Sequence, residues 1–120
     1  MGLFIGKKRI LFYLFLFVSL GVAASCQDMR NQAKKQIQYR QANKAHDEGD
    51  YPKAIRIYKK LIEEDPSNGL FEYDLGMAYL DSKDFPAVTG QIKRLKEMDR
   101  DDLADQLNVF RGEAKDRAAR

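Results

Sequence analysis

Apolar residues follow two different patterns along the chain. Residues 10–20 form a single apolar run that only Ser19 interrupts. From about residue 33 onward, apolar residues instead recur every three or four positions among charged ones, as Ala54, Tyr58 and Leu61 do. This spacing is the period of a helix with one buried face, so the chain beyond residue 32 is predicted to be all-α.

Proline, glycine and short polar residues divide this region into helices. Pro52 suits the first turn of a helix, where a missing N–H costs nothing, and Asp50 can accept from the free backbone donors there. Pro66 ends that helix and is followed by a Ser-Asn-Gly turn. The predicted helices cover about 32–47, from Pro52 to near Pro66, 71–81, and from Pro86 onward.

The same pattern occurs twice in succession. Asp50-Tyr51-Pro52 returns as Asp84-Phe85-Pro86, and Leu61 returns as Leu95 at the same shift along the chain. The matches gather at positions where packing is expected, so each unit is interpreted as two helices joined by a tight turn. The two repeats cover about 35–68 and 69–102.

A last helix is predicted over about 103–117. Leu103, Leu107, Phe110 and Ala114 recur there at helical spacing, with charged residues between them. Stacked repeats cannot bury their apolar faces alone and need an atypical end. This helix is therefore expected to cap the second repeat.

The two repeats resemble the tetratricopeptide repeat (TPR), a helix-turn-helix unit whose length of about 34 residues matches the shift between them. The shared features are a small residue in the first helix, an aromatic after the turn, a small residue early in the second helix and a closing proline. These matches are Ala42 and Gly76, Tyr51 and Phe85, Ala54, and Pro66. The chain departs from the family at Gln38 and Glu72, which replace its early aromatic. The resemblance covers residues 35–100 and implies a short helical array of two repeats and a cap over residues 33–117.

The resemblance also implies a binding surface. In this family one face of each repeat's first helix lines a concave groove that receives peptides. The corresponding groove residues are Tyr39, Asn43, Leu70, Tyr73, Met77 and Leu80. In so short an array the capping helix and the first helix can instead close over the last four. Some members bind a C-terminal carboxylate with lysines, an arginine and asparagines, and only Asn43 fits that pattern here, so a helix or extended segment held by apolar contact is expected.

The N-terminal segment carries a second resemblance. Lys7, Lys8 and Arg9 precede the apolar run, and small residues follow it, in the order of a secretory signal. The run covers roughly 22 Å as a helix, which is short of a bilayer core of roughly 30 Å. The stretch Ala23-Ala24-Ser25-Cys26 resembles the lipobox of bacterial lipoproteins, although the family usually has Leu where Ala23 stands.

This second resemblance implies where the protein lies in the cell. Residues 1–25 are then a signal peptide cleaved before Cys26, which becomes the lipid attachment site, and residues 26–32 form a short tether. Gln27 replaces the Asp that retains such proteins at the inner membrane, so the outer membrane facing the periplasm is favoured. The alternatives are a soluble secreted TPR module and an uncleaved N-terminal membrane anchor. With one cysteine in the chain, no intrachain disulfide can form.

Charge and composition exclude several function classes. The formal net charge of +3 comes from three basic residues in the leader, and the rest of the chain has 18 basic and 18 acidic residues. No basic stripe for nucleic acid is visible. His46 is interpreted as a helix-end or solvent residue, and the acidic run from Asp99 to Asp105 as a helix N-terminus. We identify no catalytic residue, no metal site and no cofactor site.

The sequence therefore predicts a non-enzymatic protein that binds other proteins. The leading hypothesis is a membrane-anchored TPR lipoprotein that acts as a scaffold or adaptor in the bacterial cell envelope. Its partner would be an envelope protein or peptide segment, and its second contact would be the lipid bilayer through acylated Cys26. The rival hypothesis is a self-associating structural subunit, a homo-oligomer in which the apolar stripe of one copy meets another.

Overall fold

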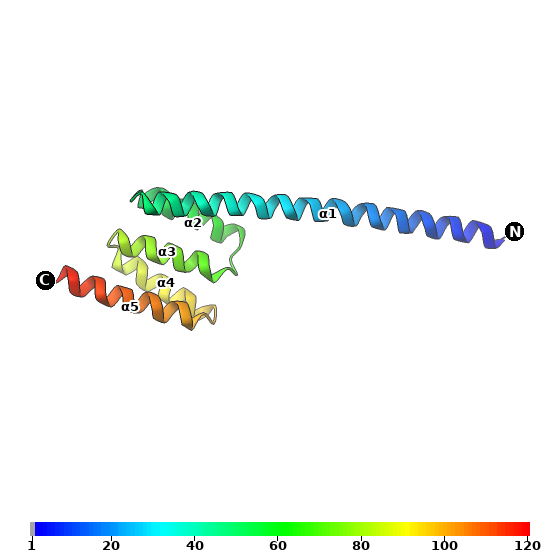
Figure 1. The fold of residues 1–120 in the computed structure, drawn as a ribbon. Coiled ribbons are helices and arrows are strands. Elements are labelled where there is room, and N and C mark those ends of the chain that lie inside the picture. The colour runs from blue at the N-terminus through cyan, green and yellow to red at the C-terminus, as the bar shows by residue number, and fades with distance from the viewer. Residues whose placement is uncertain (1) are drawn as a thin grey trace. The chain divides into compact units, whose positions relative to one another are not determined.

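The computed structural model describes residues 2–120, which form five helices and no strand (Figure 1). Their bounds are α1 Gly2–Asp47, α2 Tyr51–Glu64, α3 Gly69–Asp81, α4 Phe85–Glu97 and α5 Asp101–Ala118. The prediction of an all-α array of two repeats and a capping helix is confirmed. The chain divides between Gln36 and Ile37 into two units, which are described separately.

In the first unit, α1 begins far earlier than the sequence predicts. It starts at Gly2 rather than near Gln32, so residues 26–32 are helical and do not form an extended tether. No glycine or proline occurs between Gly21 and Gly49, and Gln, Lys, Arg and Ala in residues 26–36 all favour helix, so nothing ends the helix there. The apolar side chains of residues 10–18 are exposed. Among the described residues, no helix has the length and apolarity needed to span a bilayer.

The second unit, Ile37–Arg120, is built on one turn used twice. The side chain of Asp50 accepts a hydrogen bond from the backbone N–H of Lys53 at 3.3 Å, and Asp84 accepts from Ala87 at 3.2 Å. A proline stands in the first turn of both α2 and α4. These paired N-caps occupy equivalent positions of the two repeats, so the capping prediction is confirmed in both.

The residue before each N-cap has a left-handed backbone. Gly49 has φ +78° and Lys83, its equivalent in the second repeat, has φ +64°. This conformation lets the N–H of the following aspartate reach the helix that is ending, at 2.8 Å from Asp50 to Ala45 O and 2.9 Å from Asp84 to Tyr79 O. Glycine adopts this conformation without strain, whereas for lysine the Cβ makes it sterically unfavourable.

Two groups of buried residues form the core of this unit. The first joins α2 and α3 to residues of α1 beyond Gln36, and consists of Ala42, Ala45, Ala54, Tyr58, Leu61, Phe71, Leu75 and Ala78. The second joins α3, α4 and α5, and consists of Leu80, Val88, Ile92, Leu95, Leu103, Ala104 and Leu107. Both groups occupy apolar positions that the repeat pattern marks, and α3 contributes to both.

Gly76 allows α3 and α5 to approach closely. A Cβ built on Gly76 would collide with the side chain of Leu107, and would lie 3.3 Å from Cβ of Gln91 on α4. The small residue expected at this position is therefore needed because three helices meet there. Ala42, the equivalent residue of the first repeat, is fully buried.

Helix α5 packs on α3 and α4 as a cap (Figure 1). Leu103, Ala104 and Leu107 are buried, while Phe110 and Ala114 are half-buried against the second core group. The first turn of α5 contains Asp101 and Asp102, as expected of an acidic helix N-terminus. Its other face is exposed and largely polar, as is typical of a capping helix.

Candidate binding groove

The six predicted groove residues lie on two helices of the second unit, and they differ in exposure. Tyr39 and Asn43 belong to α1, and Leu70, Tyr73, Met77 and Leu80 belong to α3. Leu70 is 50% exposed, Tyr73 and Met77 are half-buried, and Leu80 is 7% exposed. Contacts with the side of α5 that carries Phe110 and Ala114 account for this gradient. The cap therefore covers one end of the stripe and leaves Leu70 open.

Tyr39 is tied to α3. Its hydroxyl donates a hydrogen bond to the carboxylate of Asp74 at 2.7 Å, and its ring lies 5.5 Å from that of Phe71, centroid to centroid. Burial raises the pKa of Asp74, and the Tyr39 hydrogen bond and nearby His46 act in the opposite direction. Burial, followed by the Asp74 carboxylate, raises the pKa of Tyr39. Tyr39 is therefore part of the contact between successive repeats.

Asn43 holds the first repeat together. The hydroxyl of Tyr58 on α2 donates to the side-chain oxygen of Asn43 at 2.7 Å. Tyr58 is 1% exposed, and burial followed by the charge of Asp74 raises its pKa. The side-chain oxygen of Asn43 is engaged within the repeat, so this groove position has a structural role.

His46 makes a contact that its place in the sequence did not predict. It does end a helix, as predicted, but it is not a solvent residue, because only 18% of its side chain is exposed. Its Nε2 lies 2.6 Å from the carboxylate of Asp81, and its ring meets the ring of Tyr51 edge-on at 5.7 Å. The spacing in sequence could have predicted this contact. Tyr39–Asp74 and His46–Asp81 have the same separation in sequence, and both pairs join the first helices of successive repeats.

A second missed pair lies on the other side of α3. Glu72 is buried at 3% exposure, and its carboxylate accepts from Nε of Arg94 on α4 at 3.2 Å. Glu72 stands where the family's early aromatic is expected. A buried charge is tolerated only with a partner, so Arg94 compensates for this departure from the family pattern.

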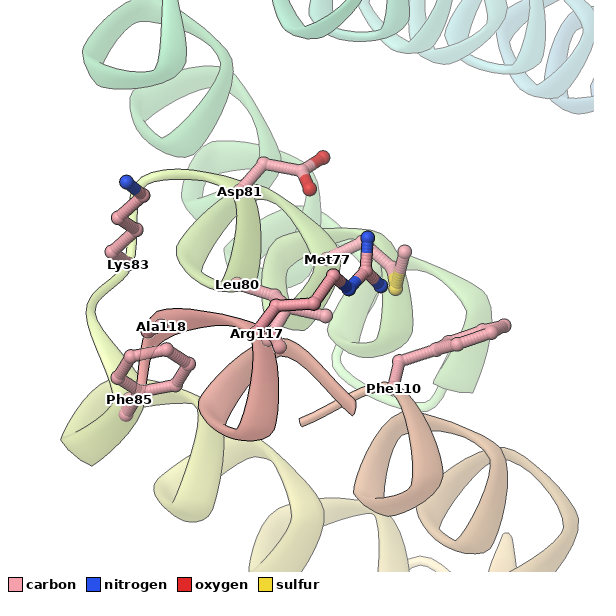
Figure 2. Close-up of a pocket in the computed structure, with 9 residues that line it drawn as sticks. Met77, Leu80, Asp81, Lys83, Phe85, Phe110, Arg117 and Ala118 are labelled. Atoms are coloured by element: carbon pink, nitrogen blue, oxygen red, sulfur yellow. The ribbon is translucent and has the colours of Figure 1, made fainter. Parts of the chain in front are cut away.

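A cavity opens where the predicted stripe meets the cap. It has a volume of about 380 Å³ and lies between α3 and α5, with the start of α4 at one end (Figure 2). Its lining consists of Met77, Leu80, Asp81, Lys83, Phe85, Phe110, Ala114, Arg117 and Ala118. In Figure 2, Phe85 and Phe110 stand at opposite ends, with Leu80 and Arg117 between them. The sequence pointed to Met77 and Leu80, but could not supply the residues that α5 brings to them.

No metal centre is assembled around these residues in the part of the chain that the structure describes. Across residues 2–120, no three His, Cys, Asp or Glu side chains are placed to hold a metal ion together. Cys26 is exposed on α1. The groups that surround the cavity can therefore offer apolar contact, hydrogen bonds and charge.

Comparison with known families agrees with this geometry. A family model described as tetratricopeptide repeat matches residues 45–109. The chain belongs to the tetratricopeptide repeat family. No curated protein and no solved structure matches it. The TPR assignment made from the repeats is therefore confirmed. TPR arrays are typically non-catalytic protein-interaction modules with a concave binding surface.

Proposed function

We propose that this TPR protein is a lipid-anchored scaffold of the bacterial cell envelope, which recruits a partner protein to the membrane. The main support is the TPR array itself, because its inner helix α3 keeps an apolar stripe that the cap covers only in part. Leu70 at 50% exposure, with half-buried Tyr73 and Met77 beside it, offers the kind of surface that a helix or extended segment binds.

The anchor rests on the N-terminal residues. Cys26 follows a basic tripeptide, an apolar run and small residues, and its side chain is exposed and without a disulfide partner. One acyl chain anchors a protein only marginally, whereas two or more hold it stably. A diacylglyceryl group on Cys26 would attach the protein to the outer membrane, facing the periplasm.

The scaffold is tested by capture of its partner from solubilised envelope. Leu70→Asp places a charge in the stripe, and we expect it to abolish capture that the unmodified chain supports. Val109→Asp is the matched control, since Val109 is also an exposed apolar residue at 57% but stands on α5. Equal capture by both variants would contradict the groove, and circular dichroism checks that each variant remains helical.

The anchor is tested by mass spectrometry of the membrane-extracted protein. The N-terminal peptide should begin at Cys26 and carry the mass of a lipid. Cys26→Ala should lose this modification, whereas Ser25→Ala, which keeps a small residue before the cysteine, should retain it. An unmodified peptide that begins at Ser25 would exclude lipid attachment.

Self-association is the second candidate, because the exposed end of the stripe would suit a second copy as well as a partner. Light scattering on the full chain over a range of concentrations separates the two. A monomer at all concentrations excludes self-association. A stable dimer that dissociates on Met77→Asp or Leu70→Asp excludes an open groove.

A further inference from the structure

The cavity between α3 and α5 has a chemistry more specific than an apolar groove. The inference drawn from it rests on the proposed scaffold function, since it names the kind of segment the groove accepts. Ligand pockets in proteins typically measure roughly 300–1,000 Å³, so a volume of about 380 Å³ has room for a large side chain of a partner.

The floor of the cavity is apolar. Leu80, Phe85, Phe110 and Ala114 line it, and Met77 borders it from α3. Such pockets accept the aliphatic or aromatic side chains on which most of the binding free energy of an interface depends. The cavity is therefore suited to one apolar anchor residue.

The rim of the cavity carries an excess of positive charge. Arg117 extends from α5 toward Met77 in Figure 2, its side chain is 78% exposed, and within residues 2–120 its ion pair is a long one of 3.8 Å to Glu113. Lys83 forms no ion pair among the described residues. Lys115 lies 5.8 Å from the centroid of the Phe85 ring. The acidic member of the rim, Asp81, is already bonded to His46.

Lys83 occupies a backbone position that is unfavourable for it. Its φ of +64° matches that of Gly49 at +78°, the equivalent residue of the first repeat. A left-handed conformation strains a non-glycine residue, as it also does Asp99 at φ +55° before α5, and at Lys83 the strained residue lines the cavity. A lysine at this position places a positive charge beside the cavity. A glycine would adopt the backbone conformation without strain but would bring no charge.

We propose that the cavity binds a partner segment in which a large apolar side chain is flanked by carboxylates. The apolar side chain enters between Phe85 and Phe110, and the carboxylates face Lys83 and Arg117. These basic residues lie on the turn before α4 and at the end of α5. They are not at the positions of the carboxylate clamp of other TPR proteins, where this chain has Asn43 as the one match and otherwise Tyr39, Asp74, Ala104 and Asn108.

The test measures fluorescence anisotropy of three labelled peptides with the full chain in detergent. The first peptide is Gly-Ser-Glu-Phe-Leu-Glu-Ser-Gly, the second replaces both Glu by Lys, and the third replaces Phe and Leu by Ala. The first should bind at least about tenfold more tightly than the third, because an apolar side chain is lost from the cavity. Equal or tighter binding of the lysine peptide, or no binding of the first at about 1 mM, would overturn the proposal.

Variants of the chain locate the binding. Lys83→Gly removes the charge and relieves the strain, and combined with Arg117→Gln it should weaken binding of the first peptide by about three- to tenfold. Ala114→Leu fills the cavity from α5 and should abolish binding. Lys93→Gln is the charge control and should leave affinity unchanged, because Lys93 is an exposed residue of α4 that does not line the cavity. Unchanged affinity in the double variant and in Ala114→Leu would contradict this site.

The failure of this inference differs from the failure of the scaffold proposal. If the envelope partner depends on Leu70 but is captured equally by the Lys83→Gly, Arg117→Gln variant, the scaffold stands and the acidic segment is wrong. If the unmodified chain captures no partner at all, the scaffold proposal fails, and the peptide measurements still decide the chemistry of the cavity.

Discussion

In the first repeat Tyr58 donates its hydroxyl to Asn43, whereas its equivalent in the second repeat is Ile92, which packs among Val88, Leu95 and Leu107. The two repeats share N-caps, prolines and a left-handed turn residue. Their interiors differ, because the first uses alanines and a hydrogen-bonded tyrosine while the second is aliphatic. The same turn can therefore be combined with a polar or an apolar interior. Turn geometry depends on residues that are neighbours in sequence, whereas packing depends on residues from different helices.

The contacts that α3 makes with α1 and with α5 also differ in polarity. α1 and α3 are joined by Tyr39–Asp74 and His46–Asp81, both polar. α3 and α5 are joined by Leu80, Leu107 and the close approach at Gly76. Polar contacts need defined partners at a defined distance, whereas the aliphatic contact depends on side-chain shape and is tight at Gly76 but open beside Leu80. The cavity occurs at the aliphatic contact.

The largest effect is expected where the repeats are alike. Leu61 and Leu95 are equivalent and both fully buried, so Leu61→Ala and Leu95→Ala should each lower the free energy of unfolding by about 3 kcal/mol. Urea unfolding followed by circular dichroism measures both. A loss below about 1 kcal/mol for either variant would show that its core group contributes little.

The close approach at Gly76 gives the next effect. Gly76→Ala forces Leu107 to move and should destabilise the fold by about 1 kcal/mol despite the better helix propensity of alanine. Gly90→Ala on α4 is the control, because nothing lies within 4 Å of its Cβ, and it should stabilise by about 1 kcal/mol. Thermal unfolding that shows the same sign for both would contradict tight packing of α3 on α5.

The hydrogen-bonded interior of the first repeat is tested by Tyr58→Phe. The substitution leaves the Asn43 oxygen unpaired, so the free energy of unfolding should fall by about 1 kcal/mol at neutral pH. Tyr73→Phe is the control, since the Tyr73 hydroxyl forms no hydrogen bond within the described residues, and it should change stability by less than about 0.5 kcal/mol. Equal effects would mean that the Asn43 bond contributes nothing.

The same tyrosine predicts how stability depends on pH. Burial raises the pKa of Tyr58 and of Tyr39 above the ordinary value of 10.0. The folded state then holds these protons when the unfolded state has lost them, so the contribution of the two tyrosines to stability is constant below pH about 10 and is lost as the pH rises above it. Urea unfolding between pH about 8 and about 11 should show this decline, and Tyr58→Phe should reduce its slope.

The smallest effect concerns the turn that the two repeats share. Lys83→Gly should leave stability unchanged or raise it by up to about 1 kcal/mol, because the left-handed conformation suits glycine. Gly49→Lys should lower it by about 1 kcal/mol. Destabilisation by Lys83→Gly would show that the lysine side chain stabilises the fold, and the argument from strain at Lys83 would then be wrong.

Much of the fold could be predicted from particular residues. Asp50 and Pro52, with Asp84 and Pro86, identify two helix starts because capping depends on neighbours in sequence. The start of α1 could not be predicted in the same way, because residues 26–36 contain no stop signal and helical character continues through them. In the candidate groove, the exposure of Leu70 and the burial of Leu80 could not be predicted from the sequence, because both depend on where α5 lies.

The sequence by itself determined the helix-turn-helix repeat, its turns, the apolar face of each helix, the capping helix and hence the TPR family. All of these arise from interactions within one turn or one helix, which spacing encodes directly. Only the tertiary structure decided that Tyr39 meets Asp74, that His46 meets Asp81, and that Phe110 and Arg117 form a cavity with Met77 and Leu80. Those contacts depend on the angles at which helices pack, and residues far apart in the chain meet only after packing has set those angles.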